Sequence, residues 1–101
     1  MGLKTIRWDI TEHLGSEAEV AAYLEAVFEG GDPDEIRDAL GHVAKARGIT
    51  DLAQAIGLSR SGLYKALSED GNPSFETVTA LLKALGVRLS VSPVARGEPV
   101  A

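Results

Sequence analysis

The sequence predicts an all-α domain of about five helices that ends in one short β-strand. Apolar residues recur at helical spacing through most of the chain, and each such stretch begins after a capping residue and ends at glycine or a turn cluster. Strict alternation of apolar and polar residues is clear only near the C-terminus. The 101 residues are the length of one domain. We place this domain at residues 16–94, between an N-terminal arm at 1–15 and a frayed tail at 95–101.

The arm carries a weak alternating pattern, as in a short strand or an extended segment. Its apolar members are Ile6, Trp8 and Ile10. A first helix begins after Ser16, because Ser16 and Glu19 have the spacing of a capping box, in which each side chain accepts a hydrogen bond from the other residue's backbone. Gly30 and Gly31 end this helix. Its apolar stripe consists of Val20, Leu24, Val27 and Phe28.

The second helix has the clearest start. Asp32 is a good cap, and Pro33 follows at the first helical position, where its missing N–H is harmless. Lys45 and Arg47 lie in the last turn, where cations stabilise a helix, and Gly48 ends it. Its apolar stripe is Ile36, Ala39, Leu40, Val43 and Ala44.

Two short helices and a longer one complete the helical part. Thr50 or Asp51 begins the first short helix, and Ser59 caps the second, which runs to about Leu67. A turn cluster at 69–73 leads to Ser74, which caps the longer helix, and Gly86 ends it. The residues predicted to face inward on this last helix are Phe75, Val78, Leu81, Leu82 and Leu85.

The period then changes to two. Val87, Leu89 and Val91 alternate with polar residues, which predicts a strand with Pro93 near its end. A lone strand in a helical domain has unpaired edges. We expect it to pair with its own copy across a dimer axis, and the segment 6–10 is the alternative partner.

The two short helices have the features of a helix-turn-helix at residues 50–67. Ala53 is small enough for a second helix to pack closely, and Gly57 can adopt the left-handed conformation that ends the first helix. Leu58 and Leu63 flank the cap Ser59 as a hydrophobic staple, a contact that fixes the angle at which the chain enters a helix. The shared core is predicted to be Leu52, Ile56, Leu63 and Ala66 or Leu67.

With Leu63 and Leu67 facing inward, the opposite face of the second short helix carries side chains suited to DNA. Arginine can contact guanine at two atoms, and serine can contact a base or a phosphate. Tyr64 is either a DNA contact or a core aromatic residue. Gly62 either lets the DNA backbone approach or is a tolerated surface glycine. The predicted DNA contacts are Gln54, Ser59, Arg60, Ser61, Tyr64 and Lys65.

The charge distribution also indicates residues 45–67 as the part of the chain that binds nucleic acid. The net charge is −5, but residues 45–67 hold four basic side chains and one acidic one, whereas residues 1–44 hold ten acidic and three basic ones. A basic stretch in an acidic chain is where a polyanion can dock. The acidic remainder is mostly solvated surface or, alternatively, a surface for a basic protein.

Other functional classes find no support in the sequence. Cysteine is absent, no apolar run approaches the ~18 residues of a membrane span, and no signal peptide is evident, so we expect a cytoplasmic protein without a membrane anchor. We find no nucleophile with a base, no phosphate-binding loop and no metal-ligand spacing around His13 or His42. We therefore expect neither an enzyme nor a metal or cofactor site.

These residues resemble known families. The stretch 50–67, with the entry to the next helix at 72–74, is similar to the helix-turn-helix of the lambda-repressor-like (Xre/Cro) superfamily. Nearly the whole chain resembles the antidote proteins of HigA-like toxin–antitoxin modules. Its arm, with Trp8 and His13, and its tail at 95–101 depart from that pattern. The stretches that carry the resemblance are 22–24, 31–33, 39–41, 44–48 and 62–73.

This resemblance implies the antitoxin of a type II toxin–antitoxin module. Such a protein is a cytoplasmic homodimer that binds operator DNA, represses its own operon and neutralises a RelE/ParE-like toxin, typically a small basic ribonuclease. The alternative is a stand-alone transcriptional regulator of the Xre family without a toxin partner.

Overall fold

The computed structural model describes residues 15–94, which form five helices and contain no strand. The all-helical prediction is therefore confirmed for this part of the chain. Most of the arm predicted at 1–15 and all of the tail at 95–101 lie outside the described residues, and with them Trp8 and the segment 6–10. The helices are α1 (Glu17–Gly30), α2 (Pro33–Arg47), α3 (Ile49–Ile56), α4 (Arg60–Ala66) and α5 (Phe75–Ala84).

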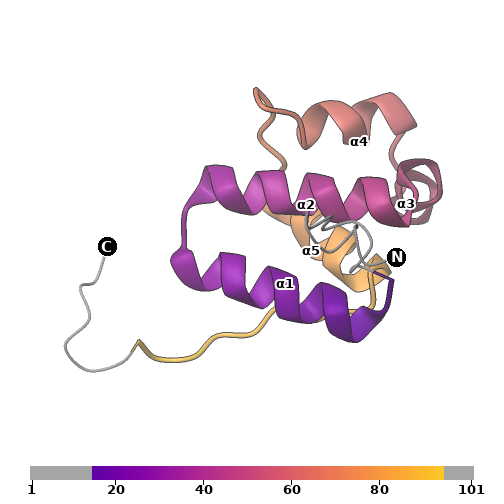
Figure 1. Ribbon diagram of the computed structural model, residues 1–101. Coiled ribbons are helices and arrows are strands. Elements are labelled where there is room, and N and C mark those ends of the chain that lie inside the picture. Colours follow the sequence, from indigo (N-terminus) through magenta and orange to yellow (C-terminus); the bar gives the residue numbers. More distant parts are fainter. Residues whose placement is uncertain (1–14, 95–101) are drawn as a thin grey trace, which may run out of the picture.

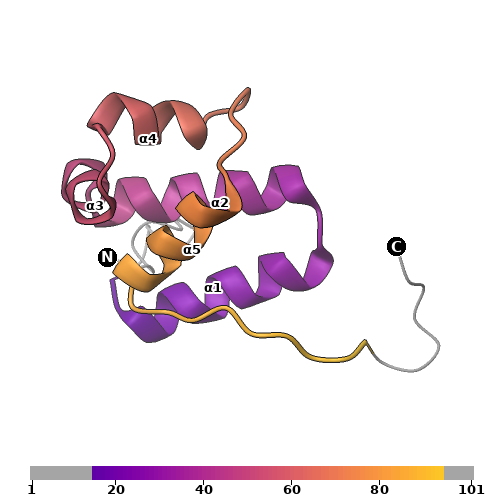
Figure 2. The ribbon, with the colours of Figure 1, turned by 180° about the vertical axis from the view of Figure 1, so that it is seen from behind.

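Helix α2 lies in the middle of the molecule. Helix α1 runs antiparallel to it on one side, and α4 lies on the opposite side (Figure 1). Helix α5 crosses behind α2 and packs against α3, as the reverse view shows (Figure 2). Leucine, valine and alanine side chains from all five helices fill the space between them, which gives one apolar core. The buried residues are Val20, Leu24, Ala39, Leu40, Val43, Ala44, Leu52, Ala53, Leu63, Leu67, Leu81, Leu82 and Leu85.

The helix starts follow the predicted caps. The Ser16 hydroxyl oxygen accepts a hydrogen bond from the Glu19 N–H at 3.1 Å, and Glu19 Oε1 accepts one from the Ser16 N–H at 3.3 Å, which completes the capping box. Asp32 caps α2, and Ser74 caps α5 through the Thr77 N–H at 3.0 Å. Each cap satisfies N–H groups that have no partner inside the helix.

Two local predictions were wrong. Helix α3 begins at Ile49, directly after Gly48, so Thr50 and Asp51 lie inside its first turn and the start has no side-chain cap. Phe75, predicted to face inward, is 72% exposed. It is the first residue of α5, ahead of the turn in which Val78 and Leu81 reach the core.

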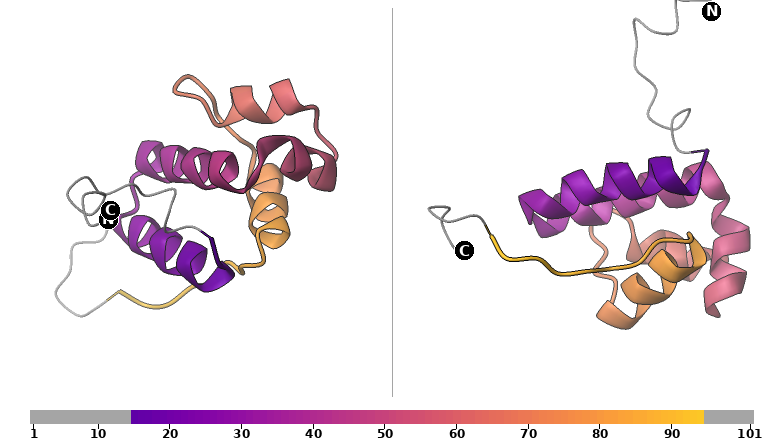
Figure 3. Two further views of the ribbon diagram at one scale, coloured as in Figure 1. Left: turned by 45° about the vertical axis from the view of Figure 1, so that its right-hand side comes forward. Right: turned by 90° about the horizontal axis from the view of Figure 1, so that it is seen from below.

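The predicted C-terminal strand is also absent from the described residues. Residues 87–94 run beside α1 without regular secondary structure (Figure 3). Only Val87 makes a backbone hydrogen bond, from its N–H to the Leu82 carbonyl at 3.0 Å. The prediction of a strand was wrong, because a strand requires a paired neighbour and none is present among residues 15–94.

Helix α2 also holds the segment that follows α4. The Arg37 side chain is mostly buried and donates hydrogen bonds to Asp34 at 3.2 Å, to Asp38 at 3.1 Å and to the backbone carbonyl of Gly71 at 3.5 Å. Gly41 allows α2 to approach the end of α4, because a Cβ at this position would lie 3.3 Å from the Leu67 carbonyl oxygen. These contacts fix where α4 sits on α2.

Candidate nucleic-acid interface

The turn between α3 and α4 has the geometry that the sequence predicted. Gly57 adopts the left-handed conformation, with a φ of 80°. The Leu58 N–H donates to the Ala53 carbonyl at 2.9 Å, and the Gly57 N–H donates to the Gln54 carbonyl at 3.3 Å. This pair of bonds satisfies carbonyls at the end of α3 that would otherwise lack partners. The chain therefore breaks cleanly at Gly57, and α3 and α4 are separate helices.

Ser59 sets the start of α4. Its hydroxyl oxygen accepts a hydrogen bond from the Gly62 N–H at 2.9 Å, so Ser59 is the cap that the sequence indicated. A Cβ at Gly62 would lie 2.9 Å from that same oxygen. Gly62 thus leaves room for the cap, an explanation that neither sequence interpretation of this glycine included.

Small and apolar side chains join α3 to α4. Ala53 is 2% exposed and Leu63 is completely buried, so α4 lies close to α3 at the predicted position. Leu58, the predicted partner of Leu63 in a hydrophobic staple, is 37% exposed and is not part of the buried core. Burial of Leu63 fixes the rotation of α4, because the residues on the opposite face must then point to solvent.

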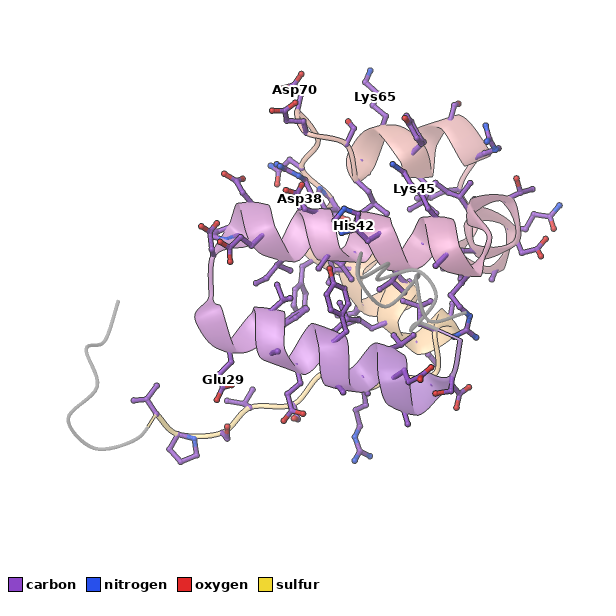
Figure 4. The ribbon with its side chains drawn as sticks, in the orientation of Figure 1. Glu29, Asp38, His42, Lys45, Lys65 and Asp70 are labelled. Atoms are coloured by element: carbon purple, nitrogen blue, oxygen red, sulfur yellow. The ribbon has the colours of Figure 1, made fainter. Side chains whose placement is uncertain are left out.

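All six predicted DNA contacts are exposed side chains. Tyr64 is 51% exposed, which excludes a role as a core residue. Arg60 occupies the first position of α4, and Ser61 follows it, with its hydroxyl oxygen 3.5 Å from that of Ser59. Lys65 points away from the rest of the molecule on the outer side of α4 (Figure 4). Gln54 contributes from the neighbouring helix α3.

Lys45 belongs to this surface and was missing from the predicted set. Its Nζ atom lies 5.6 Å from the centre of the Tyr64 ring, a distance at which a cation is attracted to an aromatic face. Lys45 points from α2 toward α4 (Figure 4). Lys45 was already part of the basic stretch 45–67. Its predicted place in the last turn of α2, however, did not indicate that α4 would lie beside Lys45. Arg47, by contrast, is partly buried.

A shallow groove of about 210 Å³ lies next to the Lys45–Tyr64 pair, between α2 and the loop after α4. His42 borders it, and its Nδ1 atom lies 3.3 Å from the Tyr23 hydroxyl of α1. Burial raises the pKa of Tyr23 above its ordinary value, and the charge of Asp38 adds to the rise.

Acidic residues limit the basic surface on one side. Glu69 and Asp70 lie in the loop directly after α4, and Asp70 is at the tip of that loop (Figure 4). A polyanion that contacts Arg60 and Lys65 would meet repulsion from this loop if it shifted toward the C-terminal end of α4. On this side of the molecule, the exposed cations Lys45, Arg60 and Lys65 therefore form a short patch.

Among residues 15–94, no three histidine, aspartate or glutamate side chains come close enough together to hold a metal ion. Among the same residues, every helix is too short or too polar to cross a membrane.

Comparisons with known proteins identify the family. A family model described as "Probable addiction module antidote protein" matches residues 4–93. An uncharacterized protein of Haemophilus influenzae is 44% identical over 84 residues, which are 83% of this chain and 87% of that protein. No solved structure matches the chain significantly. An addiction module pairs a toxin with its antidote, so membership implies a toxin partner of some kind. The chain belongs to the family of probable addiction module antidote proteins.

Proposed function

We propose that the chain is the antitoxin of a type II toxin–antitoxin module and that it binds operator DNA as an autorepressor. The α3–turn–α4 unit is then a helix-turn-helix of the lambda-repressor-like type, and α4 enters the major groove. One observation carries the proposal: α4 is held by the Gly57 turn and the Ser59 cap so that Arg60, Ser61 and Lys65 face solvent together. Residues of these types contact base edges and phosphates.

The functional unit in this proposal is a homodimer. A single α4 contacts only a few base pairs, whereas two copies about 34–36 Å apart reach successive major grooves on one face of the DNA. The operator is then a palindrome. The proposal includes no enzymatic activity, because the sequence has no histidine near Ser59 or Ser61 and Ser59 already serves as the cap of α4.

The toxin in this proposal is a small basic protein of the RelE/ParE type. The antidote family supports a toxin partner, and the acidic character of residues 1–44 supports a basic one. The alternative is a stand-alone regulator without a toxin. The reading frame adjacent to this one distinguishes the two, because a short frame that encodes a basic protein favours the antitoxin.

Two alanine substitutions test the DNA contacts. We expect Arg60→Ala to weaken operator binding by about 1–3 kcal/mol and to relax the base preference at one position. We expect Lys65→Ala to weaken binding to all sequences alike and to reduce the salt dependence by roughly one phosphate contact. Gel-shift titrations on the DNA upstream of the chain's own reading frame, at several salt concentrations, measure both effects.

Matched controls exist on other faces of the molecule. Arg88→Ala and Lys83→Ala remove the same charges from exposed positions after and on α5. If the controls lose as much affinity as Arg60→Ala and Lys65→Ala, or if all four variants bind like the wild type, α4 is not the DNA-contacting element.

A further inference from the structure

An open groove lies on the side of the molecule away from α4. It runs between α1 and the chain that follows α5, residues 86–94, and its volume is about 1170 Å³. The ribbon of residues 86–94 passes beside α1 in both views (Figures 2 and 3). The apolar lining of the groove on α1 includes Phe28, which is partly buried, and the core residues Leu24 and Leu82 also border it. Neither the α4 surface nor the proposed DNA contacts use this groove.

The extended segment, residues 86–94, has both side chains and backbone groups that are free to contact another protein. Val91 is 95% exposed, Val94 is 60% exposed and Leu89 is 40% exposed. Residues 88–94 make no backbone hydrogen bond with any other described residue. An unpaired extended backbone can form hydrogen bonds with a strand or loop of another protein. Exposed apolar side chains beside it provide a further contact surface.

The charges around the groove are nearly all negative. Glu17, Glu25 and Glu29 of α1 line it, and Arg88 is the one cation among its lining residues. Glu29 points from α1 toward the extended segment (Figure 4). A second copy of this chain would bring the same glutamates against these and would be repelled, and DNA would be repelled as well. A partner with a positive surface would be attracted.

The two glutamates near the end of α1 are unfavourable for the helix itself. Glu25 and Glu29 are four residues apart, so their charges repel each other on one face of α1. They also lie toward the C-terminal end of α1, where cations stabilise a helix, and the last turn contains no basic residue. Their placement therefore does not serve the stability of α1, which is consistent with a role in binding.

We propose that the groove between α1 and residues 86–94 is the docking surface for a basic protein partner, which is the toxin in the proposed function on which this inference rests. The carboxylates of α1 attract and orient the partner, and Leu89 and Val91 provide the apolar contact. DNA and the partner then bind on opposite sides of α2, so one chain can hold both.

A pair of charge reversals tests the docking surface. The groove variant carries Glu25→Lys and Glu29→Lys, and the probe is the purified protein encoded by the reading frame adjacent to this chain. We expect the affinity of the groove variant for this protein, measured by isothermal titration calorimetry, to be at least about tenfold lower than that of the wild type. We expect operator binding to persist, and the melting temperature to stay the same or rise by roughly a few degrees, because the helix gains favourable charges.

The matched control carries Glu69→Lys and Asp70→Lys, in the loop after α4. Each pair changes the net charge by the same four units from −5, so a general charge effect would act equally on both. We expect the control to bind the partner like the wild type and to bind DNA more tightly. A milder variant, Glu25→Gln with Glu29→Gln, keeps the side-chain size and is expected to lose less affinity than the reversals.

Four results with the variants would overturn the docking surface. These are unchanged partner affinity in the groove variant, an equal loss in the control, a loss that accompanies unfolding in the neutral variant, and a change of the groove variant from dimer to monomer in solution, which would show a second copy there. If the wild type binds operator DNA but not the adjacent protein, both the docking surface and the toxin partner are wrong. If it binds the protein but not DNA, only the repressor role fails.

Discussion

Replacing Leu63 by alanine is expected to lower the free energy of unfolding by about 3–5 kcal/mol, the range for deleting most of a buried leucine side chain from a rigid core. Leu63 is completely buried and lies in the middle of α4, where the core side chains of the other helices surround it. The deletion removes apolar contact and leaves a cavity that the fold cannot fill. In a domain of this size, a loss of this magnitude removes much of the total stability.

Thermal and urea unfolding followed by circular dichroism measure this effect. Leu58→Ala is the matched control, because Leu58 is 37% exposed in the turn just before α4. We expect it to cost less than about 1 kcal/mol, as most substitutions at the surface do. Similar losses for the two variants would contradict the burial of Leu63 and, with it, the rotation of α4 that exposes Arg60 and Lys65.

Replacing Gly71 by alanine is expected to cost about 3 kcal/mol, at the upper end of the range for an added methyl group in a tightly packed place. A Cβ at Gly71 would collide with the backbone carbonyls of Lys65 and Ala66 at the end of α4. Backbone atoms cannot rotate out of the way as a flexible side chain can. The loop would have to move, which would also break the hydrogen bond from Arg37 to the Gly71 carbonyl.

Gly30→Ala provides the comparison for this prediction. Gly30 is the last residue of α1, its φ is not positive, and a Cβ there would have no neighbour within 4 Å. We expect it to leave the stability unchanged or to raise it by up to about 1 kcal/mol, because alanine restricts the unfolded chain more than glycine does. Equal unfolding midpoints for the two variants would show that the loop after α4 is not tightly packed against that helix.

Structural features that depend on a few neighbouring residues were predictable from the sequence. The capping box of Ser16 and Glu19, the cap at Ser59 and the left-handed Gly57 each involve groups within about four positions of one another. The inward position of Leu63 followed from helical periodicity. Together these determined the exposed face of α4, and all six predicted DNA contacts, four of which lie on α4, are exposed.

Features that depend on distant segments were not predictable. The alternation after Val87 indicated a strand, but whether a strand forms depends on a pairing partner that residue patterns do not specify. Lys45 reaches Tyr64 only because α4 folds back along α2. Gly71 looked like an ordinary turn residue, whereas the structure shows that it is required by close packing against the end of α4. The groove beside α1 arises in the same way, from a segment that crosses the molecule after α5.

The position of α2 between α1 and α4 has a consequence for the proposed binding of DNA. Helix α1 carries four glutamates and no basic residue, whereas the stretch 45–67 has four basic side chains and one acidic one. These two parts of the described chain give an electric dipole moment directed from α1 toward α4. If the chain binds DNA as proposed, the field of the duplex would turn this moment before contact so that α4 leads, and the association rate would depend strongly on ionic strength. A basic protein that covers α1 would cancel the negative end of the dipole and alter the rate at which the complex finds its operator.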